Sequence, residues 1–394
     1  MARIVCISKY PPLEGGISAK TYWLTKALGD LGHEVHVVTD RPGVAPEYSH
    51  PMEDRELALK NVFIHRPHGD IPWHIPDDKH RVLDLLNMAI EITNEVNPDV
   101  IDTGYLVPYG IAGYLTSQAT GVPFVVRHGG SDLRKFMEAG IWGTLFEKAL
   151  SAAAMVITDW IHATLFNGYR VFLIPPYVPD PAFFNPNNRK ADDKPILAIV
   201  GKANYYWRHK SWHRIAAIMD LVGSEFQYLN ISQGIGLSDF KEFVGESAKR
   251  ANVKWETFVP LWKMPDLLKR VDGLFVFNGE LLFPAFSNLV LEGLYSGTTL
   301  ITDSRDLARH YEKEGITVSD LPGEILAVSA NEPHQAASQI IDYFKNRKIS
   351  HSLPLSAERD YQQYVTANEE ALLEGAHRSR DSSVTQNEQN IYNL

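Results

Sequence analysis

The stretch RIVCISKYPPLEGGISAKTYWLTKALGDLGHEVHVVT, residues 3–39, decides the fold of this chain. Its opening run, Arg3–Ser8, is compact and apolar, which predicts a buried strand. A Gly-Gly turn at 15–16 comes next, followed by a helical pattern over 18–31, and Glu34–Thr39 alternates as a second strand. A strand, a helix and a second strand in this order are typical of a parallel sheet covered by helices.

The same alternation continues along the rest of the chain. In the first half it predicts further strands at Val62–His65, Asp99–Asp102, Pro123–Arg127 and Met155–Thr158. In the second half it predicts strands at Ile196–Val200, Phe226–Ile231, Val253–Phe258, Gly273–Phe277, Thr298–Thr302 and Glu324–Val328. The pattern therefore indicates an α/β protein with two Rossmann-like, doubly wound domains, which face a cleft at the carboxyl ends of their strands.

A proline-rich stretch at 174–186 and a polar run at 187–193 interrupt this alternation, as an interdomain linker would. The helical pattern resumes near the end of the chain, and the last residues are rich in Ser, Asn and Gln, which is typical of disorder. We therefore expect a first domain at 1–180, a linker at 181–194, a second domain at 195–356, a final helix at 357–376 that packs back on the first domain, and a disordered tail at 377–394.

Composition and charge narrow the class of protein. Of the 394 residues, 44% are hydrophobic and 22% are charged, a balance typical of globular proteins. The net charge of −10 disfavours nucleic acid as a partner. The single cysteine, Cys6, lies in an apolar run and is expected to pack in a core without a disulfide. We expect a cytoplasmic protein, because the N-terminal apolar run is too short for a signal peptide and no apolar stretch reaches membrane-spanning length.

Two motifs of the first half lie at strand ends. Gly15 and Gly16 follow the first strand and precede its helix, so that a phosphate could meet free backbone N–H groups there, although a plain tight turn would use the same glycines. The dinucleotide pattern G-x-G-x-x-G is absent from this turn, which disfavours NAD. His128 follows the predicted strand 123–127, where it could hydrogen-bond a sugar hydroxyl or belong to a structural turn.

Two motifs of the second half combine cations with a helix start. Lys202 follows the predicted strand 196–200, and Lys210 comes eight residues later. Cations at a strand end can neutralise a diphosphate leaving group, and they are equally common on exposed loops. The run 286–294 predicts a helix with Ser287 or Asn288 as its N-cap.

The start of this last helix could hold a phosphate. Free N–H groups from Leu289 onward would lie at the positive end of the helix dipole. Glu292 lies about one turn further, where its carboxylate could accept hydrogen bonds from ribose hydroxyls or remain solvated.

These motifs resemble those of the large family of retaining glycosyltransferases with the GT-B fold, which includes sucrose synthases and bacterial mannosyltransferases. The likeness extends to about residue 375. It rests on a Gly-Gly turn, a strand-end His-Gly, an IPNGVD-like segment, a basic pair and the last glutamate of an E-x7-E motif. In this chain these are Gly15-Gly16, His128-Gly129, residues 174–180, Gly201-Lys202 with Lys210, and Glu292.

The resemblance implies transfer of a sugar from a nucleoside-diphosphate sugar, with retention of configuration and without a metal or cofactor. It places the donor on the second domain and a sugar, small-molecule or lipid-linked acceptor on the first, with membrane contact only for a lipid-linked acceptor. It implies catalytic roles for His128, Lys202 and Lys210. It implies donor binding by Gly15, Gly16, Ser287, Asn288, Leu289 and Glu292, and we expect Glu280 to join them in place of a family glutamate that this chain lacks.

The chain departs from the family pattern at two positions. Lys202 replaces the usual arginine, and Pro284 replaces the first glutamate of E-x7-E. Glu280 is four residues earlier and could take over that role, or the pocket could accept a sugar with fewer hydroxyls. The missing glutamate also leaves open a second function, that of a catalytically silent subunit that binds nucleotide sugars.

Overall fold

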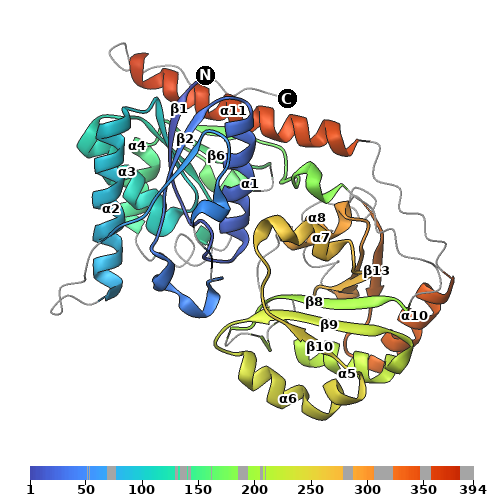
Figure 1. The fold of residues 1–394 in the computed structure, drawn as a ribbon. Coiled ribbons are helices and arrows are strands. Elements are labelled where there is room, and N and C mark those ends of the chain that lie inside the picture. The colour runs from blue at the N-terminus through green and yellow to red at the C-terminus, as the bar shows by residue number, and fades with distance from the viewer. Residues whose placement is uncertain are drawn as a thin grey trace.

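The structure is a computed structural model. It describes residues 1–50, 52, 54–68, 77–128, 132–133, 140, 143–160, 162–184, 194–204, 207–208, 210–277, 287–305, 323–346 and 356–381. Two lobes lie one above the other in Figure 1, each built on its own sheet.

A seven-stranded sheet forms the first lobe, with the strand order β3-β2-β1-β4-β5-β6-β7. All its neighbouring strands are parallel. Its strands are β1 (Arg3–Ile7), β2 (Glu34–Val38), β3 (Val62–His65), β4 (Val100–Thr103), β5 (Phe124–Arg127), β6 (Met155–Thr158) and β7 (Val171–Leu173). The order reverses between β1 and β4, so that a crevice opens at the carboxyl ends of these strands.

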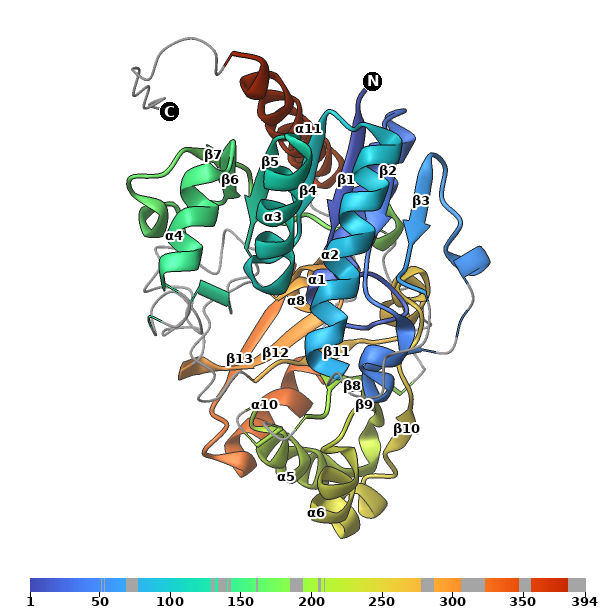
Figure 2. The ribbon, with the colours of Figure 1, turned by 90° about the vertical axis from the view of Figure 1, so that its left-hand side faces the viewer.

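Helices cover both faces of this sheet, as a parallel sheet buried on two sides requires. One face carries α2 (Asp77–Val96), α3 (Ile111–Thr120) and α4 (Gly143–Ala152), which stand in front of the sheet in Figure 2. The other face carries α1 (Gly16–Asp30) and the C-terminal helix α11 (Ala357–Asp381). Each face has its own apolar core.

The second lobe repeats this design with six parallel strands in the order β10-β9-β8-β11-β12-β13. They are β8 (Ile196–Lys202), β9 (Gln227–Gln233), β10 (Lys254–Glu256), β11 (Gly273–Phe275), β12 (Thr299–Asp303) and β13 (Ile325–Val328). Its described helices are α5 (Trp212–Val222), α6 (Leu237–Arg250), α7 (Met264–Leu268), α8 (Asn288–Tyr295) and α10 (Pro333–Asn346). The two-domain α/β prediction is confirmed, because both sheets are parallel and interleaved with helices.

The predicted strands are all present, with ends shifted by up to two residues, and one strand was missed. The missed strand, β7, directly precedes the proline-rich stretch at 174–186, and no strand was expected there. The helix predicted at 18–31 begins two residues earlier, at Gly16. Helix α11 runs to Asp381, five residues beyond the predicted helix, and the rest of the expected tail lies outside the described residues.

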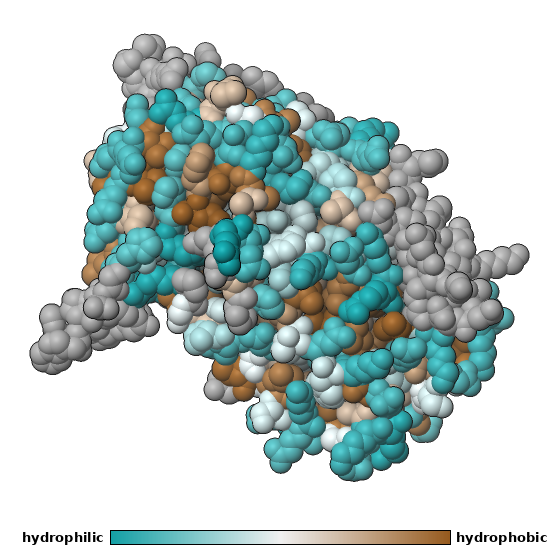
Figure 3. Space-filling model, viewed as in Figure 1, coloured by the Kyte–Doolittle hydropathy of each residue, from teal (hydrophilic) through white to brown (hydrophobic). Residues whose placement is uncertain are grey.

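Aromatic side chains join the two lobes. The rings of Tyr22 and Trp262 lie 5.9 Å apart, and those of Phe184 and Tyr295 lie 5.2 Å apart. Leu291 of α8 and Leu261 share the core that α1 and α11 form on the first sheet. Figure 3 shows a largely hydrophilic face with apolar side chains on both lobes near the line where they meet. No described helix combines the length and apolarity needed to cross a membrane.

Candidate functional site

The Gly-Gly turn brings the first lobe against the second at the carboxyl end of β1. Gly15 has φ 142° and ψ 168°, a conformation that favours glycine, and it is the N-cap residue of α1. A Cβ atom at Gly15 would lie 3.1 Å from Lys202 Nζ and 3.8 Å from Lys9 Nζ. Glycine is therefore needed here both for the backbone angle and for the close approach of two cations.

Three lysines converge on this turn from both lobes. Lys9 follows β1 and Lys202 ends β8, and their amines lie within hydrogen-bonding reach of each other. Lys210 donates from Nζ to the carbonyl of Lys202 at 3.0 Å. Lys202 Nζ also lies 4.6 Å from the ring centre of Tyr48, a residue of the first lobe. The two domains thus close around one basic cluster.

Burial works against the charges in this cluster. It lowers the pKa of Lys202 to about 7, with repulsion from Lys9 as the next cause, and lowers the pKa of Lys210 to about 8. Burial also raises the pKa of Glu14 to about 7, and one oxygen of this carboxylate is buried without a hydrogen-bond partner in the described part of the chain. Mutually repelling, poorly solvated ammonium groups are the surroundings in which an added anion is bound most strongly.

Helix α8 begins beside the same turn. Ser287 is its N-cap and accepts a hydrogen bond from the Val290 N–H at 3.3 Å. Asn288 donates from Nδ2 to the carbonyl of Gly16 at 2.8 Å, so that its side chain links the two domains. Leu289 is half-buried and packs into the apolar cores of both lobes. The predicted residues Gly15, Gly16, Ser287, Asn288 and Leu289 therefore lie along one border between the lobes.

Glu292 is buried one turn into α8 and faces the first lobe. Burial raises its pKa to about 7, and Tyr177 donates its hydroxyl hydrogen to Oε1 at 3.3 Å, which opposes that rise. The ammonium group of Lys20 contributes a weaker stabilisation of the carboxylate. A carboxylate held this way, with a second oxygen that has no hydrogen-bond partner among the described residues, can accept hydrogen bonds from a ligand hydroxyl.

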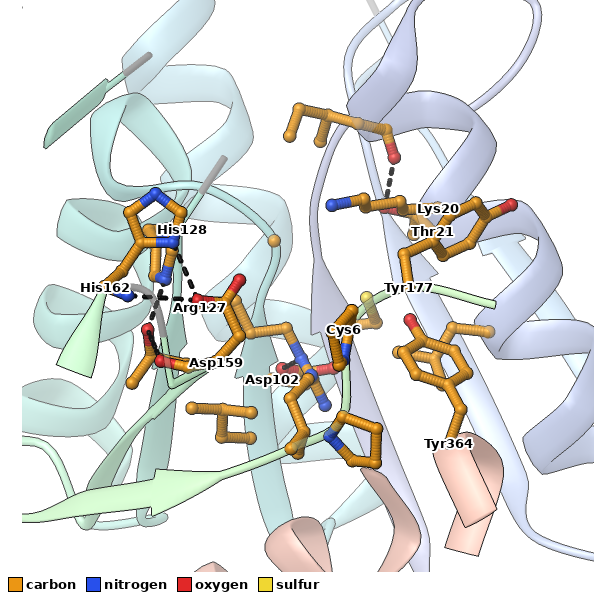
Figure 4. A pocket seen from close by; sticks show the side chains of 18 of the residues that line it. Cys6, Lys20, Thr21, Asp102, Arg127, His128, Asp159, His162, Tyr177 and Tyr364 are labelled. Atoms are coloured by element: carbon orange, nitrogen blue, oxygen red, sulfur yellow. Dashed lines mark hydrogen bonds and ion pairs between the residues drawn. The ribbon is translucent and has the colours of Figure 1, made fainter. Parts of the chain in front are cut away.

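A pocket of about 130 Å³ opens next to Glu292, within the first lobe. Its walls come from α1, from the ends of β4, β5 and β6, and from the segment after β7 (Figure 4). His128 follows β5 and bonds through Nε2 to the Thr158 hydroxyl at 2.6 Å. Burial, reinforced by the neighbouring His162, holds the pKa of His128 far below its ordinary range, so that its imidazole is neutral.

His162 and Asp159 form a second polar pair in the same wall. Asp159 Oδ1 lies 2.8 Å from His162 Nδ1 and also accepts the His162 backbone N–H at 3.1 Å. Burial alone would raise the pKa of Asp159, but these hydrogen bonds outweigh it and lower the pKa. The pocket therefore offers neutral and charged polar groups at the carboxyl edge of the first sheet.

The structure brings together nine of the ten residues that the sequence singled out, in two adjoining places. Gly15, Gly16, Lys202, Lys210, Ser287, Asn288 and Leu289 border the cleft, Glu292 lies between cleft and pocket, and His128 lines the pocket. Glu280 and Pro284 lie outside the described residues, so that the exchange suggested between them stays a prediction.

Sequence reasoning missed Lys9, Glu14, Lys20 and Tyr48. Lys9 and Glu14 flank the Pro-Pro turn before α1, and their position at a strand end was the available signal. Tyr48 had no such signal, because it reaches the cleft from a loop after β2. Among the described residues, no cluster of three or more histidine, cysteine or carboxylate side chains could hold a metal ion.

Comparisons with known proteins agree with this architecture. Residues 14–170 match the family described as Glycosyltransferase Family 4. The search of curated proteins found no match. The fold resembles that of sucrose-phosphate synthase from Thermosynechococcus elongatus, with a TM-score of 0.66, 16% identity, and coverage of 98% of this chain and 100% of the other.

Two more solved structures show the same fold. HepE from Anabaena, in complex with UDP and glucose, aligns with a TM-score of 0.64 and 13% identity over 94% of this chain and 98% of the other. The lipopolysaccharide outer core galactosyltransferase WaaB aligns with a TM-score of 0.53 and 14% identity over 94% of this chain and 99% of the other. The chain therefore has the GT-B fold of these glycosyltransferases.

Proposed function

We propose that this protein transfers a sugar from a nucleoside-diphosphate sugar to an acceptor. The observation that carries the proposal is the lysine cluster of Lys9, Lys202 and Lys210, closed over the Gly15 turn by residues of both domains. Such a cluster suits a diphosphate, whose negative charge grows as it leaves the sugar. The family match over 14–170 and the GT-B fold support the same reaction class.

Each part of the site has a role in this proposal. The diphosphate lies against Lys202, Lys210 and the first N–H groups of α8, and the ribose hydroxyls bind Glu292. His128 borders the reaction centre from the acceptor side. As a neutral imidazole it can exchange a hydrogen bond with the reacting hydroxyl without competing with the lysines for the diphosphate.

We also propose retention of configuration and independence from divalent metals, which the resemblance to the retaining family implies. The departing phosphate would then accept the proton of the acceptor hydroxyl on the face from which it leaves. The bond between the anomeric carbon and the phosphate oxygen breaks as the bond to the acceptor oxygen forms. Cationic side chains at the leaving group are the groups that would replace a metal ion in this step.

The test uses the purified full chain and radiolabelled UDP-, GDP-, ADP- and dTDP-glucose. UDP-glucose is the first choice, because the structurally similar HepE was solved with that ligand. We expect one nucleotide to raise the melting temperature and its sugar to be transferred or slowly hydrolysed. Binding without turnover of any sugar would favour the silent binding subunit, and the absence of nucleotide binding would overturn both functions.

Three further assays separate the finer proposals. His128→Ala should reduce transfer sharply with little change in nucleotide affinity, because His128 lies outside the lysine cleft. Transfer should continue in EDTA, and a loss that magnesium or manganese restores would contradict metal independence. The anomeric configuration of the product, read by NMR, decides between retention and inversion.

A further inference from the structure

The pocket of the first lobe contains cationic side chains whose hydrogen-bond donors are not all satisfied among the described residues. Lys20 extends from α1 toward the wall that holds His128 and His162 (Figure 4). Among the described residues its ammonium group makes no hydrogen bond or ion pair, and its nearest aromatic ring, Tyr177, is centred 5.6 Å away. Lys20 is partly buried, and its ammonium group has the carboxylates of Asp159 and Glu292 in its neighbourhood but no acceptor in hydrogen-bond contact, so that part of its hydration is lost without a direct replacement.

A second cationic side chain of the pocket is only partly satisfied. Arg127 donates from Nε to Asp102 Oδ1 at 2.7 Å and from Nη1 to Asn368 Oδ1 at 2.6 Å. Its third nitrogen, Nη2, is buried without a hydrogen-bond partner among the described residues. The Nδ1 atom of His128 is unpartnered in the same way. Three side-chain nitrogen atoms of residues that line one cavity, Lys20 Nζ, Arg127 Nη2 and His128 Nδ1, therefore have no hydrogen-bond partner among the described residues.

Each acidic group of the pocket is engaged through its Oδ1 atom, and neither accepts a hydrogen bond from Lys20, Arg127 Nη2 or His128 Nδ1 among the described residues. Asp102 forms an ion pair with Arg127, and Asp159 Oδ1 lies in contact with His162 Nδ1. The pocket therefore has more hydrogen-bond donors than acceptors engaged with them, and the unsatisfied donors are on the cationic side chains of Lys20 and Arg127. An oxyanion supplies several acceptor lone pairs and a negative charge in one small group, which a neutral sugar hydroxyl does not.

The volume of the pocket limits the size of the ligand that can enter it. A cavity of about 130 Å³ is well below the ~300–1,000 Å³ that whole drug-sized ligands occupy. We propose that this pocket binds a small oxyanion head group, a carboxylate or a phosphate, through Lys20 and Arg127 Nη2. If the protein is the glycosyltransferase proposed above, on which this further step rests, the head group belongs to the acceptor, and the substrate class is that of anionic acceptors.

The proposal is tested by equilibrium dialysis of the full chain with ³²P-labelled inorganic phosphate and ¹⁴C-labelled acetate at constant ionic strength. Saturating UDP is present, so that the lysine cleft is occupied and only the pocket is counted. We expect one site for at least one of the two probes. Binding of phosphate alone, acetate alone, or both identifies the head group as a phosphate, a carboxylate or either.

Variants assign the site to Lys20. Lys20→Met should lose about tenfold or more in probe affinity, the loss expected for a charge-assisted hydrogen bond. Its melting temperature should equal or exceed that of the wild type, because a partly buried charge without a hydrogen-bond acceptor is gone. Lys148→Met removes an exposed lysine of the same lobe, outside the pocket, and should change neither quantity. If Lys20→Met does not fold, Lys20→Gln serves in its place.

The failures of the two proposals can be told apart. If UDP does not bind, the donor site is wrong, and dialysis of the Lys202→Met variant without UDP still measures the pocket. If UDP binds and neither probe binds up to a high concentration, the oxyanion site is overturned while the glycosyltransferase proposal stands. Equal probe affinity in the wild type and in Lys20→Met also overturns it.

Discussion

Two charged clusters lie at the carboxyl edge of the first sheet, and they are built in opposite ways. In one, Asp40 is buried and accepts hydrogen bonds from Arg81 Nε at 2.7 Å, Arg81 Nη2 at 2.9 Å and the Tyr109 hydroxyl at 2.6 Å. In the other, Lys9 and Lys202 crowd together around Gly15 without a counter-ion in hydrogen-bond contact among the described residues. The first cluster is complete, whereas the second is not.

The Asp40 cluster serves the stability of the fold, whereas the lysine cluster serves the binding of a ligand. Arg66 donates to the carbonyl oxygens of Asp40 and Pro11, so that the complete cluster fixes the loop that leads to the Gly-Gly turn. In the lysine cluster, burial and then repulsion from Lys9 lower the pKa of Lys202, so that its charge opposes folding. A protein keeps such an arrangement where a ligand completes it. Variants of the two clusters should therefore affect different measurements.

The largest effect is expected from Asp40→Ala. Removing this carboxylate leaves Arg81 and Tyr109 without their acceptor, and breaking a buried pair typically costs about 3–5 kcal/mol of unfolding free energy. Urea unfolding measures it. Asp30→Ala is the control, since its exposed pair with Lys26 should contribute below about 1 kcal/mol. A cost for Asp40→Ala as small as the control would remove the distinction between the clusters.

The opposite pattern is expected from Lys202→Met and Lys210→Met. Stability should stay level or rise, and turnover should fall by about 10²–10³-fold, as when a group that stabilises transition-state charge is lost. Nucleotide affinity should fall less than turnover. Steady-state kinetics and melting curves on the same samples measure both. Lys249→Met, at an exposed site of the second lobe, is the matched control, and full turnover in Lys210→Met would contradict its role.

A smaller effect is expected from Glu292→Gln. Replacing the carboxylate keeps the shape of the side chain but weakens charge-assisted hydrogen bonds to ribose, at a cost of about 1.5–3 kcal/mol in binding free energy. Calorimetry with the best nucleotide measures the change. Tyr177→Phe removes the hydroxyl that now holds Glu292 and leaves the carboxylate in place, so that affinity should be nearly kept. Unchanged affinity in a folded Glu292→Gln variant would exclude Glu292 from the site.

The smallest effect is a dependence of nucleotide affinity on pH. Lys202 and Lys210, with pKa values of about 7 and 8, are charged at pH 6 and largely neutral at pH 9. Glu14, with a pKa of about 7, gains a negative charge over the same range. All three changes disfavour an anion, so that affinity should fall as pH rises, with proton uptake on binding near pH 7.5. Lys202→Met should flatten this dependence, and a rise in affinity with pH would contradict it.

The fold was predictable because its signals are local. Apolar runs such as Arg3–Ile7 and the turn at Gly15 repeat often enough to give two parallel sheets, and the structure confirms both. Strand β7 was missed because the prolines that follow it are a stronger local signal than three partly exposed residues.

The site was predictable only where its residues fall in motifs. Gly15, Lys202 and Glu292 are 90 or more positions apart, and recognised motifs were what linked them. Lys20 and Tyr48 have no motif, and their roles depend on long-range packing that places α1 opposite His128 and Tyr48 beneath Lys202. Whether such a charged side chain has a partner is decided by the assembled fold, which the sequence alone does not reveal.

Helix α11 changes where the first domain can be said to end. Its residues Val365, Ala371 and Leu372 are buried in the core on the α1 face of the first sheet. The second domain is therefore an insertion into the first, and a fragment that stops at residue 184 would lack one wall of that core. The chain leaves the first domain near Phe184 and returns to it near Tyr361, and these two places lie side by side. The rings of Phe184 and Tyr361 are 6.3 Å apart, and the Tyr361 hydroxyl donates to Asp180. An isolated first domain should thus be expressed as residues 1–184 joined by a short linker to 356–381.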